Sequence, residues 1–409
     1  MDVSIILMIL GGVIFYGHYL EKISEKISVP DILGLVFLGV FIGPIMQWVS
    51  PDDFGIYGSL LSTLVLALIL YSSGLGMDVE KLKGYVNASM GLVYIGNFAT
   101  WALVSALAYF IFDINALSAL YVGGVLSGTS SAVVLVFIKN LNLTDKTKNI
   151  LTIESVKTDI FNLVFPSAIL GVMLTGDLSI GKIGLDIVLL FFISLGIGVV
   201  SGIVWAYIIN KIPVVKETKF STICAMLVVY GLTQYLGYNG ALMSIAFGIT
   251  LGNIGVFKRN SIVEKLVPQT QNIVTKKEVD FLSEINFILK VYFFIYVGIS
   301  IQVDSFNTLA WVSLIILSMF VLRAIIVKYV ISKDTPLLDK SMISIMRPNG
   351  MATAVMGGLP LAQGYVEGEE IQSILYSGLI LSIIITNILF FLLDKKIILP
   401  FYKSFYGGK

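Results

Sequence analysis

Three long runs of the sequence contain no charged residue: 84–112, 114–138 and 187–210. A helix needs roughly 20 mainly apolar residues to cross the hydrocarbon core of a bilayer. Inside that core, only helices and closed barrels satisfy all of their backbone hydrogen bonds. The whole chain is 57% hydrophobic and only 13% charged, whereas a soluble domain carries about 25% charged residues. The sequence therefore predicts an all-α polytopic membrane protein.

Apolar segments of spanning length recur along the chain, and we expect about thirteen transmembrane helices. They cover 2–20, 31–50, 58–76, 86–111, 115–138, 148–174, 183–210, 219–236, 239–255, 283–301, 307–331, 340–363 and 370–393. The pair 219–236 and 239–255 is short and is joined by a turn rich in Gly and Asn, residues that favour tight turns.

Basic residues fall on alternate connections between these segments. If the N-terminus lies outside, 22 of the 27 basic residues lie in inside connections or at inner helix ends. Lys182 alone lies outside, and the remaining four basic residues lie within spans. Cytoplasmic loops of membrane proteins carry such an excess of Lys and Arg. We therefore expect the N-terminus outside and the C-terminus inside.

One predicted span, 148–174, carries charged side chains at membrane depth, including Glu154 and Asp159. Asp159 lies about 11 residues from the inner end of its helix, or roughly 16 Å at 1.5 Å per residue. Steps of about 100° per residue place Ser155, Asp159 and Asn162 on one stripe of that helix, whereas Lys157 faces away from it. An ionisable residue in the bilayer is costly and indicates a functional site.

Two other spans contain breaks that expose backbone at membrane depth. The first is 123–132, which includes Gly128, Thr129 and Ser130, and the second is 347–353, which begins with Arg347 and a proline. Non-helical backbone at this depth is tolerated where it lines a cavity or is buried in protein. Paired interrupted helices are typical of the binding site of a secondary transporter. Close packing of small residues is the alternative explanation.

The positions of the breaks predict an inverted repeat, formed by helices 4–6 and 11–13, with two crossing discontinuous helices. Besides Arg347, the basic residues at depth are Lys157, Lys290 and Arg323, and the acidic ones are Glu154 and Asp159. Asp159, Lys290, Arg323 and Arg347 lie at similar depth, and we expect them to meet in one layer.

The chain lacks the residues that most enzymes and metal sites need. One cysteine and one histidine exclude a disulfide framework, a Cys-cluster metal site and a histidine-based triad. We expect no enzyme activity, no cofactor and no nucleic-acid partner.

Several motifs resemble a known family. The segments concerned are 30–44 with its glycines and Pro44, 70–78 ending in Asp78, Glu154-Ser155 with Asp159, 292–302 from Tyr292 to Gln302, Leu322-Arg323-Ala324, and Arg347 with Gly350. Together they are similar to the monovalent cation/proton antiporter superfamily, in its NhaP/NHE-type branch of archaeal or bacterial Na⁺/H⁺ antiporters. The resemblance spans nearly the whole chain and implies an NhaA-like fold.

The resemblance also implies roles for individual residues. Asp159 would bind Na⁺ and a proton in alternation, with Ser155 and the Thr129 carbonyl helping to ligate the ion. Glu154 would form a structural ion pair with Arg323. The further residues at the site would be Thr158, as an ion ligand, and Ser130, Asn162, Arg347 and Lys290 in support.

The sequence departs from the branch at Thr158, where the branch usually has Asn. A threonine supplies a hydroxyl but no charge. If Glu154 is paired permanently with Arg323, only Asp159 titrates, and we expect an electroneutral exchange of one H⁺ per cation. Lys290 is the competing consideration, because a deep lysine that exchanged its own proton would make the exchange electrogenic.

Two alternatives remain within transport. One is K⁺/H⁺ exchange or gated K⁺ efflux. The other is Na⁺-coupled organic-anion symport on a related fold, because the N-termini of broken helices can bind carboxylates. The paired acids Glu154 and Asp159 favour a cation.

The resemblance further implies different roles for different segments of the chain. Scaffold and dimerisation helices would occupy 1–80 and 183–301, the latter with a cytoplasmic loop at 256–282. Ion-transport helices would occupy 84–175 and 305–393, and 394–409 would form a short cytoplasmic tail. We expect a multi-pass homodimer in the cell membrane, in contact with lipid, that serves pH homeostasis by alternating access.

Overall fold

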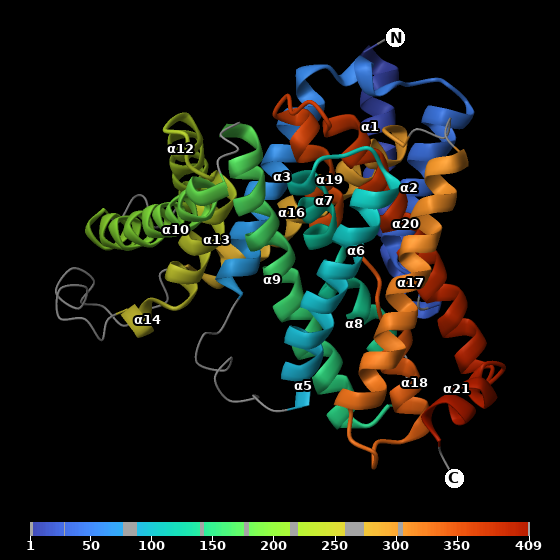
Figure 1. Cartoon of the computed structure of the whole chain (residues 1–409). Helices are drawn as coiled ribbons and strands as arrows, with labels where there is room; N and C mark the ends of the chain where they lie inside the picture. Colours follow the sequence, from blue (N-terminus) through green and yellow to red (C-terminus); the bar gives the residue numbers. More distant parts are fainter. Residues whose placement is uncertain are drawn as a thin grey trace. The chain divides into compact units, whose positions relative to one another are not determined.

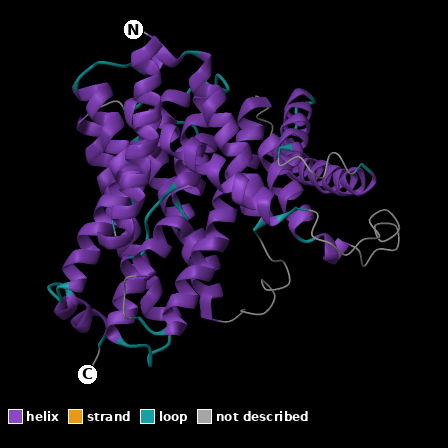
Figure 2. Ribbon diagram, turned by 180° about the vertical axis from the view of Figure 1, so that it is seen from behind, coloured by secondary structure: helices purple, strands orange, loops and turns teal. Residues whose placement is uncertain are grey.

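The computed structural model describes residues 3–27, 29–76, 88–139, 143–175, 180–212, 220–257, 274–301 and 306–407. Every regular element within these ranges is a helix (Figures 1 and 2). Six of the helices are long and apolar enough to cross a membrane. The prediction of an all-α membrane protein is thus confirmed for the described part of the chain.

The contacts divide the chain into two compact units. The first unit contains Met1–Ser59, Tyr85–Pro166 and Val291–Lys409, and the second contains Leu60–Gly84 and Ser167–Lys290. Helices α3 (Ile56–Leu75), α9 (Asp145–Thr175) and α16 (Lys276–Ile299) continue from one unit into the other.

Within the described ranges, the first unit otherwise consists of fourteen elements. They are α1 (Val3–Ile27), α2 (Asp31–Val40), the π-helical turn η1 (Phe41–Ile45), the 3₁₀ turn η2 (Pro51–Phe54), α5 (Ala88–Gly91) with the π turn η3 (Leu92–Gly96) and α6 (Asn97–Ile111), α7 (Ala116–Leu126), α8 (Ser131–Lys139), α17 (Phe306–Val330), α18 (Leu337–Ile345) with α19 (Met351–Ala362), and α20 (Gly368–Asp394), followed by α21 (Leu399–Tyr406). The second unit otherwise consists of α10 (Ile180–Lys211), α12 (Ser221–Tyr235), α13 (Gly240–Gly252) and α14 (Ile254–Phe257).

Each of the thirteen expected spans overlaps one or more of these helices. The number that crosses the membrane and their orientation stay predictions. Most of the expected cytoplasmic loop, 258–273, lies outside the described residues, and so do Asp78 and Gln302.

The second unit has its own apolar core. Tyr71 of α3 packs on Phe247 of α13 with ring centroids 5.9 Å apart, and Met226 of α12 is fully buried in the same cluster. One acidic side chain, Glu278 at the start of α16, is buried in this unit and accepts a hydrogen bond of 3.1 Å from Thr222 Oγ1. The core is therefore built by α3, α10, α12, α13 and the first part of α16.

Helices α2 and α16 approach closely in the first unit because small residues face each other. A Cβ on Gly39 would lie 2.8 Å from the Cα of Gly298, closer than real Cβ contacts. A side chain at either position would force the two backbones apart. The glycine pair thus lets α2 and α16 pack closely. The contact lies near the end of the continuous segment α2–η1, at Ile45, and near the end of α16, at Ile299.

Two of the predicted spans are interrupted helices, as expected. Helix α7 ends at Leu126 and α8 begins at Ser131, while α18 ends at Ile345 and α19 begins at Met351. The second break follows from Pro348, which has no N–H to donate and disfavours helical backbone at the residue before it. Along the chain, each interrupted pair lies between two other helical segments. The pair α7 and α8 lies between α5–α6 and α9, and the pair α18 and α19 lies between α17 and α20.

The C-terminal tail, expected only as a short cytoplasmic segment, contains helix α21. In the first unit it lies at the opposite end from the N-terminus (Figures 1 and 2). Tyr406 Oη is hydrogen-bonded to Ser344 Oγ of α18 and donates to the Ala324 carbonyl of α17 at 3.3 Å. The Lys328 ammonium lies 4.6 Å from the centroid of the Phe405 ring. Helix α21 is therefore docked against α17 and α18.

Candidate functional site

The end of α7 leaves carbonyl groups without partners in their own helix, and the second break supplies donors to them. Asn349 Nδ2 donates to the carbonyls of Leu126 (3.2 Å) and Gly128 (3.3 Å), and Arg347 Nη2 donates to that of Ser127. The last carbonyls of any helix need such partners, and no water inside a bilayer core replaces them. The two broken segments thus complete each other's hydrogen bonds.

The start of α8 is satisfied in a different way. The Ser130 amide donates to the Pro348 carbonyl at 2.8 Å, and the Ser131 amide donates to Oδ2 of Asp159 at 2.8 Å. Ser131 Oγ donates to the same oxygen at 2.6 Å. The N-terminus of a helix carries a partial positive charge, so the half-helix α8 stabilises the Asp159 carboxylate.

Asp159 keeps one oxygen available. Both hydrogen bonds end on Oδ2, and no donor to Oδ1 lies in the part of the chain that the structure describes. The residue is partly exposed, whereas its neighbours Thr158 and Asn162 are buried. Asp159 is therefore a carboxylate that is held at one oxygen and open to a proton or a cation at the other.

Thr158, the position that departs from the family pattern, is bonded to the first break. Its hydroxyl accepts a hydrogen bond from the Thr129 amide (3.2 Å) and lies 3.1 Å from Thr129 Oγ1. The Thr129 and Ser155 carbonyls each lie 3.3 Å from the same hydroxyl as acceptors. Thr158 thus fixes the extended backbone beside Asp159 with a neutral hydroxyl.

Glu154 and Arg323 form a buried ion pair between α9 and α17. Arg323 Nη1 and Nη2 donate to the two oxygens of Glu154 at 2.5 and 2.8 Å, and the two residues are only 1% and 2% exposed. Arg323 Nε donates to the Ile343 carbonyl of α18 at 2.7 Å. A two-point pair of this kind satisfies both charges where desolvation is costly.

Two further predicted residues also bond to the first break. Asn162 Nδ2 donates to the Val125 carbonyl at 3.2 Å, and its Oδ1 accepts from Ser127 Oγ at 3.1 Å. Arg347 is buried, at 2% exposure, and its Nε has no partner in the described part of the chain. The two side chains hold the end of α7 in place beside the carboxylate.

The remaining predicted residues are placed differently. Ser155 is buried, and its hydroxyl donates to the Thr152 carbonyl of its own helix at 3.1 Å. Lys157 donates to Met90 Sδ at 3.6 Å. Lys290 belongs to the second unit, with its ammonium 5.1 Å from the Phe287 ring centroid. The contacts therefore tie Asp159 to Ser131 and Thr158 to Thr129 at the first break, whereas Ser130 bonds to the Pro348 carbonyl. Neither Ser155 nor Lys157 bonds to the carboxylate.

Sequence reasoning missed two residues of this site, Ser131 and Asn349. Ser131 is the first residue of a half-helix, where backbone N–H groups lack partners and attract a carboxylate, so capping logic could have singled it out. Asn349 carries no comparable signal, because its role depends on carbonyls more than 200 positions away in the sequence.

Among the residues that the structure describes, no three His, Cys, Asp or Glu side chains are grouped so that they could hold a metal ion. The donors around Asp159 are hydroxyls, carbonyls and one carboxylate, the oxygen ligands that hard cations prefer.

Comparisons with known proteins find relatives that are named as cation/proton antiporters. The chain is 24% identical over 254 residues to "K(+)/H(+) antiporter NhaP2" of Shewanella sp. (strain ANA-3), which covers 60% of this chain and 44% of that protein. It is 24% identical over 324 residues to "Na(+)/H(+) antiporter 1" of Methanocaldococcus jannaschii, covering 74% and 70%. The chain thus spans less than half the length of the Shewanella relatives it matches.

A solved structure shows the same fold. The sodium/proton antiporter MjNhaP1 from Methanocaldococcus jannaschii at pH 8 superposes with a TM-score of 0.69 at 21% sequence identity, covering 95% of this chain and 99% of that one.

The family follows from a match to most of the sequence. Residues 9–395 match the family described as "Sodium/hydrogen exchanger, transmembrane". This match confirms the resemblance to NhaP-type antiporters and the prediction of a multi-pass protein of the cell membrane. The chain belongs to the sodium/hydrogen exchanger family.

Proposed function

We propose that the protein is a secondary antiporter that exchanges a monovalent cation for protons by alternating access. The observation that carries the proposal is the state of Asp159, held at Oδ2 by Ser131 and open at Oδ1. A single carboxylate of this kind accepts either a proton or a cation, but not both at once. This competition couples the two fluxes.

The ion site consists of oxygen atoms around the first break. Asp159 supplies the charge, and Thr129, Thr158 and Ser155 supply carbonyl and hydroxyl oxygens. Asn162 and Ser130 support the segment, and Arg347 neutralises the end of α7. No cofactor takes part, and Na⁺ and H⁺ are substrates.

One titrating group makes the exchange electroneutral, with one proton per cation. Glu154 does not compete for protons or cations, because both of its oxygens accept hydrogen bonds from Arg323. Lys290 takes no part in this scheme.

We propose Na⁺, or Li⁺, as the transported cation. Support comes from the Methanocaldococcus relative, whose name gives Na⁺/H⁺ exchange and whose alignment covers more of both chains. The Shewanella relatives are named K⁺/H⁺ antiporters, which makes K⁺ the second candidate. The family favours an antiporter over organic-anion symport. We further propose a homodimer that acts in pH homeostasis.

Reconstituted transport tests the proposal. Purified protein in liposomes with an internal pH dye should collapse an imposed pH gradient when Na⁺ or Li⁺ is added, and Asp159→Asn should abolish the response. Asp145→Asn, the same substitution at the exposed start of α9, is the matched control. If Asp159→Asn still collapses the gradient, the assignment of Asp159 is wrong.

The same assay decides cation and stoichiometry. A response to K⁺ alone would replace Na⁺ by K⁺ as the substrate. Clamping the membrane potential at several values tests electroneutrality, because a rate that changes with potential requires net charge movement.

A further inference from the structure

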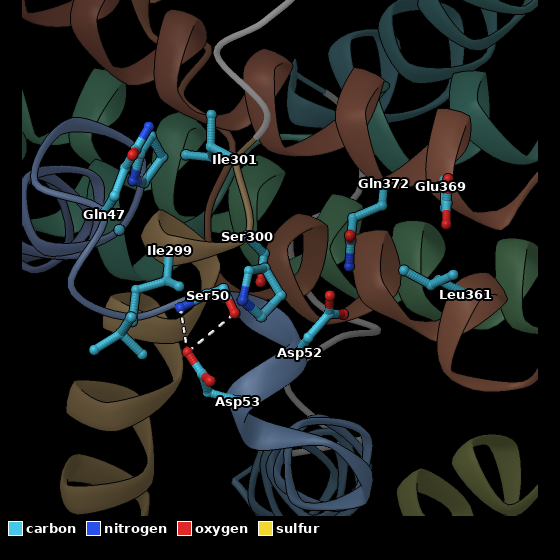
Figure 3. Close-up of a pocket in the computed structure, with 14 residues that line it drawn as sticks. Gln47, Ser50, Asp52, Asp53, Ile299, Ser300, Ile301, Leu361, Glu369 and Gln372 are labelled. Carbon is cyan, nitrogen blue, oxygen red and sulfur yellow. Dashed lines mark hydrogen bonds between the residues drawn. The ribbon is translucent and has the colours of Figure 1, made fainter. Parts of the chain in front are cut away.

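A cavity lies in the first unit, and none of the residues assigned to the site at Asp159 lines it. It has a volume of about 700 Å³, and Figure 3 shows the side chains that line it. Its walls come from η1 and the 3₁₀ turn η2, the end of α16, the end of α19 and the start of α20. These segments lie in connections that the sequence predicts to face the outside of the membrane.

Acidic and neutral polar side chains line the cavity, and none of its described lining residues is basic. Asp52, Asp53 and Glu369 contribute the carboxylates. Asp53 is occupied by the chain itself, since it accepts hydrogen bonds from Ser50 N (2.7 Å) and Ser50 Oγ (3.0 Å), which lower its pKa. The carboxylates of Asp52 and Glu369 receive no hydrogen bond from any described residue and stay open to a ligand.

Three helix C-termini add to the negative potential of the cavity, against one N-terminus, that of α20. The continuous segment α2–η1 ends at Ile45, α16 at Ile299 and α19 at Ala362, and each contributes lining residues at or near its C-terminal end. A helix C-terminus carries roughly half a negative charge. The glycine contact between α2 and α16 keeps two of these ends side by side.

One buried group at the cavity lacks a partner. Ser300, directly after α16, lines the cavity and is only 6% exposed, and its Oγ has no hydrogen-bond partner among the described residues. Figure 3 shows Ser300, Asp52 and Gln372 around the same part of the cavity. A buried hydroxyl without a partner is costly, and a bound cation or its water would satisfy it.

We propose that this cavity is a second cation site, which binds a hydrated monovalent cation between Asp52, Glu369 and Ser300. No described group of three His, Cys, Asp or Glu side chains is arranged to hold a metal ion, so the proposal is for a weakly held monovalent cation. The cavity is many times the roughly 30 Å³ that one water occupies, so the ion keeps part of its hydration shell. The site goes beyond the proposed exchange at Asp159 and concentrates cations at one end of the first unit.

Cysteine labelling tests the site without any transport. Cys224 is the only cysteine and is exposed, so Cys224→Ser gives a background for single probes. Gln372→Cys places a thiol in the cavity. Val366→Cys is the control, because position 366 is 96% exposed beside other acids and outside the cavity lining. Cationic and anionic methanethiosulfonates are compared on the full-length protein in neutral detergent at low ionic strength.

The expected result has three parts. The ratio of cationic to anionic labelling at position 372 exceeds that at 366 by about tenfold, the lower end of focusing by charged clefts. Adding Asp52→Asn and Glu369→Gln removes the excess. Replacing choline with Na⁺ at constant ionic strength slows the cationic reagent at 372 but not at 366.

Three results would overturn the proposal. They are equal ratios at the two positions, an excess that survives removal of both carboxylates, or protection by Na⁺ that is no stronger than that by choline. None of these readouts depends on Asp159, so the second site and the proposed exchange can fail separately.

Discussion

Ser131 holds Asp159 by two hydrogen bonds to one oxygen, from its amide at 2.8 Å and from its hydroxyl at 2.6 Å. The amide belongs to the first residue of the half-helix α8, so the carboxylate also caps a helix N-terminus. Both effects favour the ionised form of Asp159 over the protonated one. Loss of the contact therefore makes the carboxylate easier to protonate.

Ser131→Ala should move the exchange profile to higher pH. The substitution removes the hydroxyl donor and leaves the amide, so the carboxylate loses one hydrogen bond to its charged form. Such bonds contribute about 1.5–3 kcal/mol, and about 1.4 kcal/mol corresponds to a tenfold change in an equilibrium constant. Asp159 then retains its proton to higher pH, and half-maximal exchange in proteoliposomes should shift upward by about one pH unit.

Ser130→Ala is the matched control for this shift. Ser130 precedes Ser131, and its contact with the second break runs through the backbone amide, which the substitution keeps. Its pH profile should coincide with that of the wild type. An unchanged profile in Ser131→Ala would separate Ser131 from the control of protonation.

Thr158→Val should slow exchange about tenfold, whereas Thr158→Ser should stay near the wild type. Valine keeps the shape of threonine but removes the hydroxyl that meets Thr129 at three atoms. Each lost bond costs about 0.5–1.5 kcal/mol, and the extended segment beside Asp159 loses its fixed position. Initial rates at saturating cation measure the effect. Equal rates in the two variants would show that the hydroxyl has no positioning role.

The broad fold and the two breaks could be predicted from sequence because their causes are local. Apolar length predicts membrane helices, and Pro348 or a run of small residues predicts an interruption. The depth of Asp159 singled out the carboxylate in the same way. The ends of the helices differ from the predicted bounds where packing determines them. Helix α16, for example, begins at Lys276, whereas the predicted span begins at 283.

The partners of the site residues could not be derived from local pattern. Glu154 and Arg323 are 169 positions apart, and Asn349 meets carbonyls 221 and 223 positions away. Helical arithmetic placed Ser155 on the stripe of Asp159, but it could not indicate that the hydroxyl bonds to Thr152 instead. The docking of α21 likewise depends on Tyr406 meeting α17 and α18, which lie far from it in the sequence.

The docking of α21 should be insensitive to pH until strongly alkaline conditions. Burial, and then the neighbouring Tyr406, raise the pKa of Tyr402 from 10.0 to about 12. A group with a raised pKa in the folded state contributes stability that is complete below its unfolded pKa and is lost as the pH rises through the folded one. The loss should therefore fall between about pH 10 and 12.

Thermal unfolding of the wild type and Tyr402→Phe measures this loss. The difference between their melting temperatures should be constant from pH 7 to 9 and change in favour of Tyr402→Phe above pH 10, because phenylalanine cannot ionise. Tyr57→Phe, at a tyrosine that is 73% exposed, is the control and should show no such change. A difference that already changes near neutral pH would contradict the buried position of Tyr402.

Removing one partner of the buried Glu154–Arg323 pair should destabilise the protein more than removing both, because the remaining charge would be buried without a counter-charge. Glu154→Gln leaves an arginine charge without a counter-charge at 1% exposure, and breaking one side of a buried pair costs about 3–5 kcal/mol. The melting temperature in detergent should fall clearly in Glu154→Gln and in Arg323→Met. The double variant Glu154→Leu/Arg323→Met removes both charges and should recover much of the loss, because an apolar pair avoids the cost of desolvation. If the fall in melting temperature of the double variant equals the sum of the falls in the two single variants, the two residues act independently. The structural role proposed for the pair would then be wrong.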